Sequence, residues 1–205
     1  MDATAWDARY AASELIWSAE PNRFVAAECA DLPVGRAVDL AAGEGRNAIW
    51  LASLGWRVTA IDFSQVALDK GRSMAPEAAI DWVCADATTW HAVDEYDLAV
   101  LAYLQLPAVE RRAAVRNAFV ALRLGGTFLL IGHDSTNLTE GVGGPQSPEV
   151  LYTAEDVLAD LADSPEGGDW AVEVVRAECI ARPVTDDSGV TRSALDCLVR
   201  LLRIA

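Results

Sequence analysis

The stretch VDLAAGEGRNAIWLA, residues 38–52, decides how this chain folds. Its apolar start predicts a strand over 36–42, and its second half predicts a helix over 47–54. Gly43 and Gly45 lie between them, where glycine permits unusual dihedrals and a close approach of the backbone. The helix that follows offers unpaired N–H groups at its start, and these suit a carboxylate or a phosphate. The stretch therefore predicts a strand–turn–helix unit that cradles a nucleotide-type ligand.

The remainder of the chain continues this alternation. Strands are predicted over 56–61, 80–84, 96–102 and 127–132, with helices from Ser64 to Met74, from Pro107 to Gly125-Gly126 and from Thr153 to Leu161. Two longer strands, 170–181 and 193–203, flank a polar turn at 186–189 and predict a hairpin. Alternating strands and helices predict an α/β fold with a mostly parallel sheet covered on both faces, to which the hairpin adds one antiparallel strand.

Two segments lie outside the alternation. Residues 1–34 are expected to form an N-terminal helical cap, with one helix over 3–19 that places Trp6, Tyr10, Ser13 and Trp17 on one face, and a second over 23–30. Residues 133–152 are rich in glycine and proline and form a loop that is long for a compact domain, a feature typical of lids and binding loops. We expect a single domain over residues 1–205, with this loop over a binding pocket.

Composition narrows the function. The chain of 205 residues is 52% hydrophobic and has a formal net charge of −15, from 16 basic and 31 acidic side chains. Such a field repels phosphate backbones and anionic lipids, so nucleic acid and membrane are not expected partners and a small molecule is. No apolar run reaches the ~18 residues of a membrane span, and the N-terminus does not resemble a secretory signal, so a cytoplasmic location is expected. The four cysteines and two histidines show no metal-site spacing, and no metal is predicted.

Acidic residues distinguish between the ligands that the glycine turn could bind. The pattern from Gly43 to Ala48 also fits the dinucleotide fingerprint, so alone it does not separate NAD from S-adenosylmethionine (SAM). Asp39, however, stands inside a strand that is usually apolar in dinucleotide-binding proteins, and its carboxylate suits an ammonium group. Asp62 followed by Phe63 ends the next strand, and Asp86 ends the third. Each aspartate alone reads better as a helix cap or turn residue, but together, at matching strand ends, they favour an adenosine ligand.

With these residues in place, residues 38–52 resemble the first motif of class I SAM-dependent methyltransferases. The nearest group is the small bacterial one that contains the tellurite-resistance methyltransferases, which are related to thiopurine methyltransferases. Residues 6–10, Trp-Asp-Ala-Arg-Tyr, resemble the start of the same group. The similarity covers roughly residues 5–132 well and the remainder loosely. It departs at Ala41, where the family usually has glycine.

The resemblance implies a Rossmann-like sandwich with a seven-stranded, mostly parallel sheet and an antiparallel C-terminal strand. It implies SAM as the cofactor, with Gly43 and Gly45 near its methionine portion, Asp39 near its amine, Asp62 on its ribose hydroxyls and Phe63 on its adenine. The full set of cofactor residues that it implies is Asp39, Ala41, Gly43, Gly45, Arg46, Asp62, Phe63, Asp86, Ala87 and Ala102, with Trp6, Arg9 and Tyr10 from the N-terminal motif.

Catalytic residues are expected where the fourth and fifth strands end. Methyl transfer needs alignment, desolvation and, for some acceptors, a base. Tyr103 follows the fourth strand, and His133 ends the fifth, so both are candidates beside the methyl group. A histidine suits a general base near neutral pH, but a structural histidine bonded to a loop carbonyl is an equally good interpretation, because soft nucleophiles need no base.

Three functions are compatible with these patterns. The first is a methyltransferase acting on a small-molecule acceptor through an oxygen, nitrogen, sulfur or chalcogen nucleophile, as a monomer or homodimer. The second is a protein that binds SAM or another adenosine ligand without catalysis. The third, an NAD-dependent reductase, is less favoured because the chain has no Tyr-x-x-x-Lys pair and its sole lysine is Lys70.

Overall fold

The computed structural model describes residues 3–13, 15–16, 18–162, 171–186 and 188–204. These residues form a seven-stranded sheet in the order β3-β2-β1-β4-β5-β7-β6. Its strands are β1 (Arg36–Leu40), β2 (Arg57–Asp62), β3 (Ile80–Cys84), β4 (Tyr96–Ala102), β5 (Leu122–His133), β6 (Val172–Thr185) and β7 (Thr191–Arg203). β1 to β5 pair in parallel, whereas β7 pairs antiparallel with both β5 and β6. The predicted sheet with one antiparallel strand is therefore confirmed.

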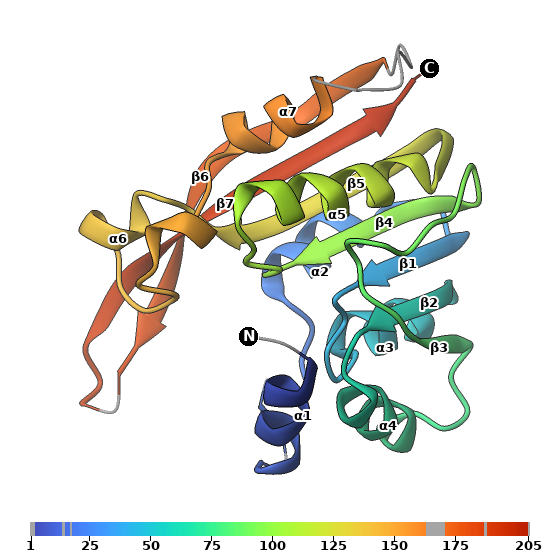
Figure 1. Ribbon diagram of the computed structural model, residues 1–205, viewed down its shortest axis with the longest axis horizontal. Helices are drawn as coiled ribbons and strands as arrows, with labels where there is room; N and C mark the ends of the chain where they lie inside the picture. Colours follow the sequence, from blue (N-terminus) through green and yellow to red (C-terminus); the bar gives the residue numbers. More distant parts are fainter. Residues whose placement is uncertain (1–2, 14, 17, 163–170, 187, 205) are drawn as a thin grey trace.

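Helices cover both faces of the sheet, as Figure 1 shows. They are α1 (Ala3–Ala11), α2 (Arg23–Cys29), α3 (Arg46–Ser53), α4 (Gln65–Met74), α5 (Ala108–Val120), the short α6 (Asn137–Glu140) and α7 (Ala154–Ala162). One buried cluster joins α5 and α7 to the sheet, and another joins α2 and α3 to its opposite face. Since side chains alternate along a strand, every second residue faces the α3 side. Among the described residues, no helix is long and apolar enough to cross a membrane.

The N-terminal helix is shorter than expected. α1 ends at Ala11 instead of continuing to residue 19, so Ser13 lies outside it, and Trp17 lies outside the described residues. The chain turns away because Lys70 on α4 binds the carbonyl oxygens of Tyr10 and Ser13, which draws the end of α1 toward α4. The second predicted helix is α2, which packs on the sheet through buried Val25 and Cys29. Of these two N-terminal helices, α1 lies near the carboxyl edge of the sheet, whereas α2 packs on its face (Figure 1).

At the ends of the later helices, the signal at Ser64 is confirmed and the one at Gly125-Gly126 is wrong. The Ser64 side chain accepts a hydrogen bond from the Ala67 amide at the start of α4. Gly125-Gly126 does not close the preceding helix, which ends at Val120. Gly125 instead lies within β5 with φ of 80°. The glycine pair marks an irregular start of β5, where the pairing with β4 shifts register.

The long loop contains structure of its own. α6 and a 3-10 turn at Pro148–Val150 break up residues 133–152. Asn137 anchors the loop to β7, because its Oδ1 accepts from the Leu195 amide and its Nδ2 donates to the Gly143 carbonyl. The loop lies beyond the carboxyl end of β5, the edge at which open α/β sheets bind ligands (Figure 1).

The α5–α7 contact supplies the first prediction. The Asp160 carboxylate on α7 is 1% exposed and accepts from Arg111 Nε at 2.6 Å. Asp160→Ala leaves a buried guanidinium without its partner and should lower the free energy of unfolding by about 3 kcal/mol. Urea denaturation measures this difference. Arg112→Ala, which removes a half-exposed partner of the same carboxylate, should change it by less than about 1 kcal/mol. Equal effects of the two variants would contradict this description.

Candidate functional site

The turn after β1 has a tight, left-handed path. Ala41, Gly43 and Gly45 have φ of 57°, 57° and 76°. A Cβ at Gly45 would lie 2.4 Å from a carbon of the Trp82 ring, so both the backbone and the packing require glycine there. Ala41 adopts the same left-handed conformation with a side chain, so a glycine would suit this position. The departure at Ala41 therefore keeps the turn and adds local strain.

The Asp62 carboxylate holds this turn against the second strand. Its Oδ2 accepts from the Gly43 amide and its Oδ1 from the Ser64 amide, both at 2.8 Å. Asp62 is 5% exposed, and burial raises the pKa of its carboxyl while the two amides lower it. A carboxylate has about four acceptor positions, so these bonds leave room for two hydroxyl donors. Asp62 thus joins β2, the glycine turn and the start of α4.

Asp39 is buried on the α3 side of β1. It is 1% exposed, and its Oδ2 finds no hydrogen-bond partner among the described residues. Burial raises the pKa of this carboxyl to about 7, against an opposing effect of the Arg46 guanidinium. A buried polar atom without a partner costs free energy, so its presence indicates a ligand or a special role. A cationic donor would satisfy it.

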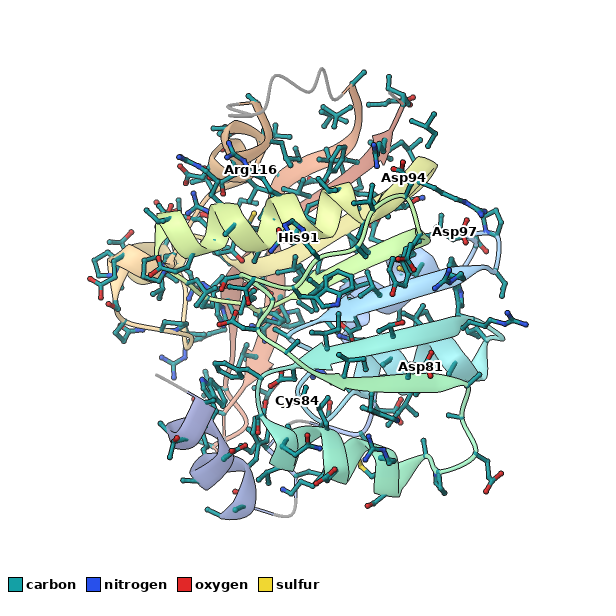
Figure 2. The ribbon with its side chains drawn as sticks, turned by 45° about the vertical axis from the view of Figure 1, so that its right-hand side comes forward. Asp81, Cys84, His91, Asp94, Asp97 and Arg116 are labelled. Atoms are coloured by element: carbon teal, nitrogen blue, oxygen red, sulfur yellow. The ribbon has the colours of Figure 1, made fainter. Side chains whose placement is uncertain are left out.

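The residues that follow the third strand reach the same edge, but Asp86 among them is bonded within its own turn. Asp86 is exposed, and its Oδ1 accepts from the amide and hydroxyl of Thr88, which is the turn arrangement that a single aspartate predicts. Ala87 is 7% exposed. Phe63 and Ala102 are partly buried at the ends of β2 and β4. The topology brings all four to the carboxyl edge, and Figure 2 shows Cys84 and Asp81 at opposite ends of β3.

The N-terminal motif lies beside α4. The Trp6 ring is 5.5 Å from the Tyr10 ring, and the Arg9 guanidinium carbon is 4.9 Å from the centre of Trp6. The Ser64 hydroxyl donates to the Asp7 carboxylate, which attaches α1 to the start of α4. Trp6 and Tyr10 therefore share one face, as their spacing predicts, and Tyr10 is buried.

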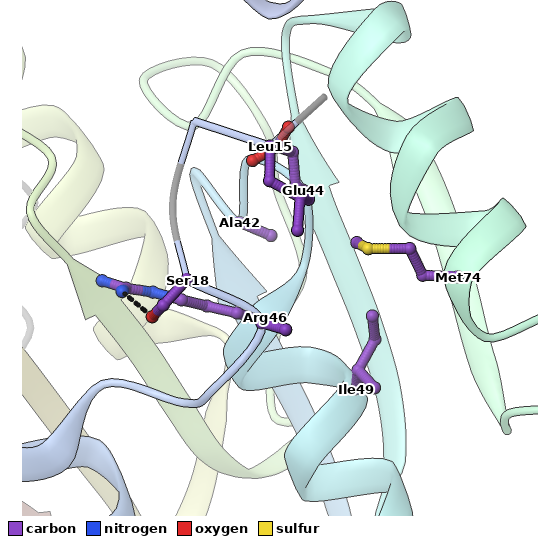
Figure 3. A pocket seen from close by; sticks show the side chains of 8 residues that line it. Leu15, Ser18, Ala42, Glu44, Arg46, Ile49 and Met74 are labelled. Carbon is purple, nitrogen blue, oxygen red and sulfur yellow. Dashed lines mark hydrogen bonds between the residues drawn. The ribbon is translucent and has the colours of Figure 1, made fainter. Parts of the chain in front are cut away.

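Glu44 and Lys70 connect this motif to the glycine turn, and the sequence had not singled out either for a role at the site. Glu44 is 3% exposed; its carboxylate accepts from the Ile16 amide and pairs with Lys70 Nζ at 3.3 Å. A cavity of about 180 Å³ lies against this contact, between the segment that holds Leu15 and Ser18, the turn, and helices α3 and α4 (Figure 3). It includes Arg46 but neither Asp39 nor Asp62, so it adjoins the predicted cofactor residues without containing them.

Tyr103 follows β4 in a strained conformation. Its φ is 60°, in the left-handed region that a bulky residue rarely adopts. Its hydroxyl donates to Asp196 Oδ2 at 2.8 Å, and burial together with the Asp196 charge raises the pKa of the phenol to about 12. The phenol is therefore neutral near pH 7. Strain of this kind persists where the surroundings hold it, and it concentrates at functional sites.

His133 ends β5 directly opposite Asp196 of β7. Its Nδ1 lies 3.3 Å from Asp196 Oδ1, and its ring centre is 4.8 Å from that of Tyr103. Arg182 Nε donates to the same carboxylate at 2.7 Å. Asp196 is 0% exposed. Burial raises the pKa of its carboxyl, but the three partners outweigh this effect and leave it below its ordinary value. The structure thus brings together both predicted catalytic residues and adds Arg182 and Asp196, which the sequence reading did not identify.

The long loop covers this group. Gly144 lies so close that a Cβ on it would be 3.0 Å from His133 Nδ1, and its φ of 74° also favours glycine. Gln105 holds the loop to β4 and β5, since its Oε1 accepts from the His133 amide and its Nε2 donates to the Val150 carbonyl. His133 is left 15% exposed at the side chain. No group of three potential metal ligands occurs within the described ranges.

Ala41 allows a direct test of the turn. Ala41→Gly relieves a left-handed alanine and should leave the protein as stable as the parent or raise its free energy of unfolding by up to about 1 kcal/mol. The neighbouring Ala42→Gly, at a residue without positive φ, should lower it by roughly 0.5–1 kcal/mol. Urea denaturation of both variants measures the difference. Equal losses in the two would show that Ala41 carries no strain.

The sequence of this chain is similar to those of known methyltransferases. Residues 37–126 match the family model described as a methyltransferase domain. Thiocyanate methyltransferase 1 of Arabidopsis thaliana is 28% identical over 141 residues, which cover 65% of this chain and 60% of that protein. Demethylmenaquinone methyltransferase of Clavibacter sepedonicus is 30% identical over 120 residues, which cover 58% and 47%. The chain thus matches about half to three-fifths of the length of these relatives.

Solved structures share the whole architecture. The N-methyltransferase NodS from Bradyrhizobium japonicum, in complex with S-adenosyl-L-homocysteine (SAH), has a TM-score of 0.71 at 18% identity, covering 98% of this chain and 99% of that one. TehB from Haemophilus influenzae has a TM-score of 0.71 at 17% identity, covering 89% and 62%. Residues 37–126 of this chain thus match a methyltransferase domain, and the solved structures, at 17% and 18% identity, share its fold.

Proposed function

We propose that this protein transfers a methyl group from SAM to a small-molecule acceptor. The buried, unpartnered carboxylate of Asp39 beside a left-handed glycine turn is the observation that carries the proposal. A cation is the ligand that such a carboxylate lacks, and SAM carries an ammonium group close to the end that donates the methyl group. NAD has no ammonium group to offer this atom.

We assign the residues at the carboxyl edge to successive parts of SAM. Asp39 would accept from the amine, and the spare acceptor positions of Asp62 would accept from the two ribose hydroxyls. Phe63 would pack on the adenine, and Asp86 with Ala87 would contact its polar edge. Arg46, close enough to Asp39 to affect its pKa, would meet the carboxylate of the methionine portion. Trp6, Arg9 and Tyr10 would close the site from α1.

Bound SAM supplies a methyl group activated by a sulfonium. The acceptor's lone pair would bond to the methyl carbon as the carbon–sulfur bond breaks, which would leave a neutral thioether. A protonated acceptor would also lose a proton, and we assign its removal to His133. Tyr103 is neutral near pH 7 and its hydroxyl already donates to Asp196, so it orients the acceptor side and does not act as the base. The loop that packs Gly144 on His133 would keep water away from the reacting atoms.

The acceptor is proposed to be small for two reasons. The net charge of −15 opposes nucleic acid and anionic membranes. The loop at residues 133–152 covers the proposed acceptor side and leaves His133 only slightly exposed. The relatives named above act on different compounds, so the acceptor's nucleophile, whether oxygen, nitrogen, sulfur or another chalcogen, is not transferred from them. A cytoplasmic location and a monomeric or homodimeric state remain predictions.

Turnover tests the proposal directly. Purified protein is incubated with SAM and thiophenol, hydrogen selenide, catechol or benzylamine, and the formation of SAH is followed. We expect turnover with at least one acceptor and a thermal shift with SAM and SAH but not with NAD. His133→Gln should lower turnover of a protonated acceptor by about 10²-fold or more at nearly unchanged SAM affinity. SAM binding without turnover on any acceptor would favour a non-catalytic binding protein, and NAD binding alone would overturn the proposal.

Asp39 gives a pH-dependent prediction. Because its folded-state pKa is about 7, the carboxyl is protonated in the ligand-free protein below that pH, and it then offers an amine no negative charge. SAM affinity measured by calorimetry should therefore fall as the pH drops from 8 to 6. Asp39→Asn should weaken binding at pH 8 and flatten this dependence. An Asn variant with parental affinity and the parental pH dependence would remove Asp39 from the site.

The raised pKa of Asp39 also predicts how the folding stability of the ligand-free protein depends on pH. A carboxyl whose pKa is raised in the folded state costs stability that grows as the pH rises from its unfolded value near 4 to about 7. Asp39→Asn should therefore raise the melting temperature of the ligand-free protein more at pH 8 than at pH 5. A uniform change at both pH values would mean that the carboxyl is not desolvated.

A further inference from the structure

The Asp196 carboxylate contacts the polar side chains of the proposed acceptor side. It lies on β7, fully buried, and three different elements direct polar atoms at it. The Tyr103 hydroxyl comes from the end of β4, the Arg182 guanidinium from β6, and the His133 imidazole from β5. A buried charge with this many partners is held in one position.

The sheet register fixes these contacts. His133 and Asp196 are directly opposed in the antiparallel pair of β5 and β7. Arg182 lies on β6 opposite Ala194, and is therefore diagonal to Asp196. Directly opposed and diagonal side chains on one face of a sheet are the ones that meet. A shift of one residue in β7 would turn Asp196 to the other face of the sheet, so the strand pairing itself sets the position of the carboxylate.

We propose that Asp196 is the positioning residue of the acceptor side: it directs Nδ1 of His133 toward itself, leaving Nε2 to accept the acceptor's proton, and holds the Tyr103 hydroxyl in place. Nδ1 is buried 3.3 Å from Asp196 Oδ1, and it completes no hydrogen bond to any described residue, so the carboxylate is the acceptor that lies beside it. A carboxylate beside one ring nitrogen stabilises the tautomer with its proton on that nitrogen. The other nitrogen is then the proton acceptor.

The same carboxylate maintains the strained Tyr103. A tyrosine with φ of 60° needs contacts that outweigh its backbone cost, and the described contacts include two: its amide donates to the Ile131 carbonyl and its hydroxyl to Asp196. Arg182 also lies over the Tyr103 ring, with its guanidinium carbon 5.8 Å from the ring centre. Loss of the Asp196 charge would therefore release Tyr103 and His133 together.

The two histidines of this chain make the proposal testable by NMR. In protein labelled with ¹⁵N-histidine, long-range ¹H–¹⁵N spectra report which ring nitrogen carries the proton, and His91→Gln assigns the signals of His133. We expect wild-type His133, in its neutral form, to carry the proton on Nδ1. Asp196→Asn should shift the population toward the Nε2–H tautomer, because an amide NH₂ can donate to Nδ1. Asp81→Asn, an exposed carboxylate on β3, is the matched control and should change nothing.

Kinetics provide the second measurement. This role for Asp196 rests on the proposed function, and with an acceptor that the enzyme turns over, Asp196→Asn should lower kcat by about a hundredfold while the KM for SAM stays within about threefold. Tyr103→Phe, which keeps the carboxylate and the imidazole contact, should preserve the Nδ1–H tautomer.

The outcomes separate the two proposals. A wild-type His133 with its proton on Nε2 would overturn the positioning role, and this result needs no variant to fold. An Asp196→Asn variant with a native melting curve and an unchanged His133 tautomer would overturn it as well. The expected tautomers without turnover on any acceptor would support the positioning of His133 and contradict the methyltransferase proposal alone.

Discussion

The two hydrogen bonds that the Asp62 carboxylate accepts from the Gly43 and Ser64 amides hold the ligand edge of this sheet in one arrangement. They connect the end of β2 to the turn after β1 and to the first residues of α4. Ser64 in turn holds α1 through Asp7, and Lys70 on α4 holds the segment after α1. The glycine turn can keep its left-handed path because this carboxylate satisfies the amide that the turn exposes.

Two buried carboxylates at this edge, those of Asp39 and Asp196, differ in their hydrogen-bond partners. The side chains of Asp39 and Asp196 point to the same side of the sheet. Of the two, only Asp196 has polar groups beside both of its oxygens. The partnered carboxylate is fixed before any ligand arrives and organises Tyr103 and His133. The unpartnered one, with a pKa near 7, is suited to bind a cation. Backbone strain lies beside both, at Ala41 and at Tyr103, as expected where a site is held by its surroundings.

The fold was largely predictable from the sequence, because the alternation of apolar strands and helices and the terminal hairpin are local patterns. The errors arose where tertiary contacts override such patterns: Lys70 draws the chain away at the end of α1, and Gly125-Gly126 lies within β5 and does not end α5. On the cofactor side, Asp39 stood out as a charge inside an apolar strand. Asp196, within the run Ala-Leu-Asp-Cys-Leu-Val, carries the same signal, but its partners come from β4, β5 and β6, and only the sheet register shows that they meet.

We propose that the carboxyl edge of β1 and β2 binds SAM through Asp39 and Asp62. A crystal structure of the protein with SAH tests it most directly, because SAH keeps the amine and both ribose hydroxyls. We expect the amine at Asp39 Oδ2, in direct hydrogen-bond contact or through one water, and the ribose hydroxyls on Asp62, with Nε2 of His133 facing the sulfur side. A ligand seated in the cavity beside Leu15 and Met74, with Asp39 still without a partner, would contradict it.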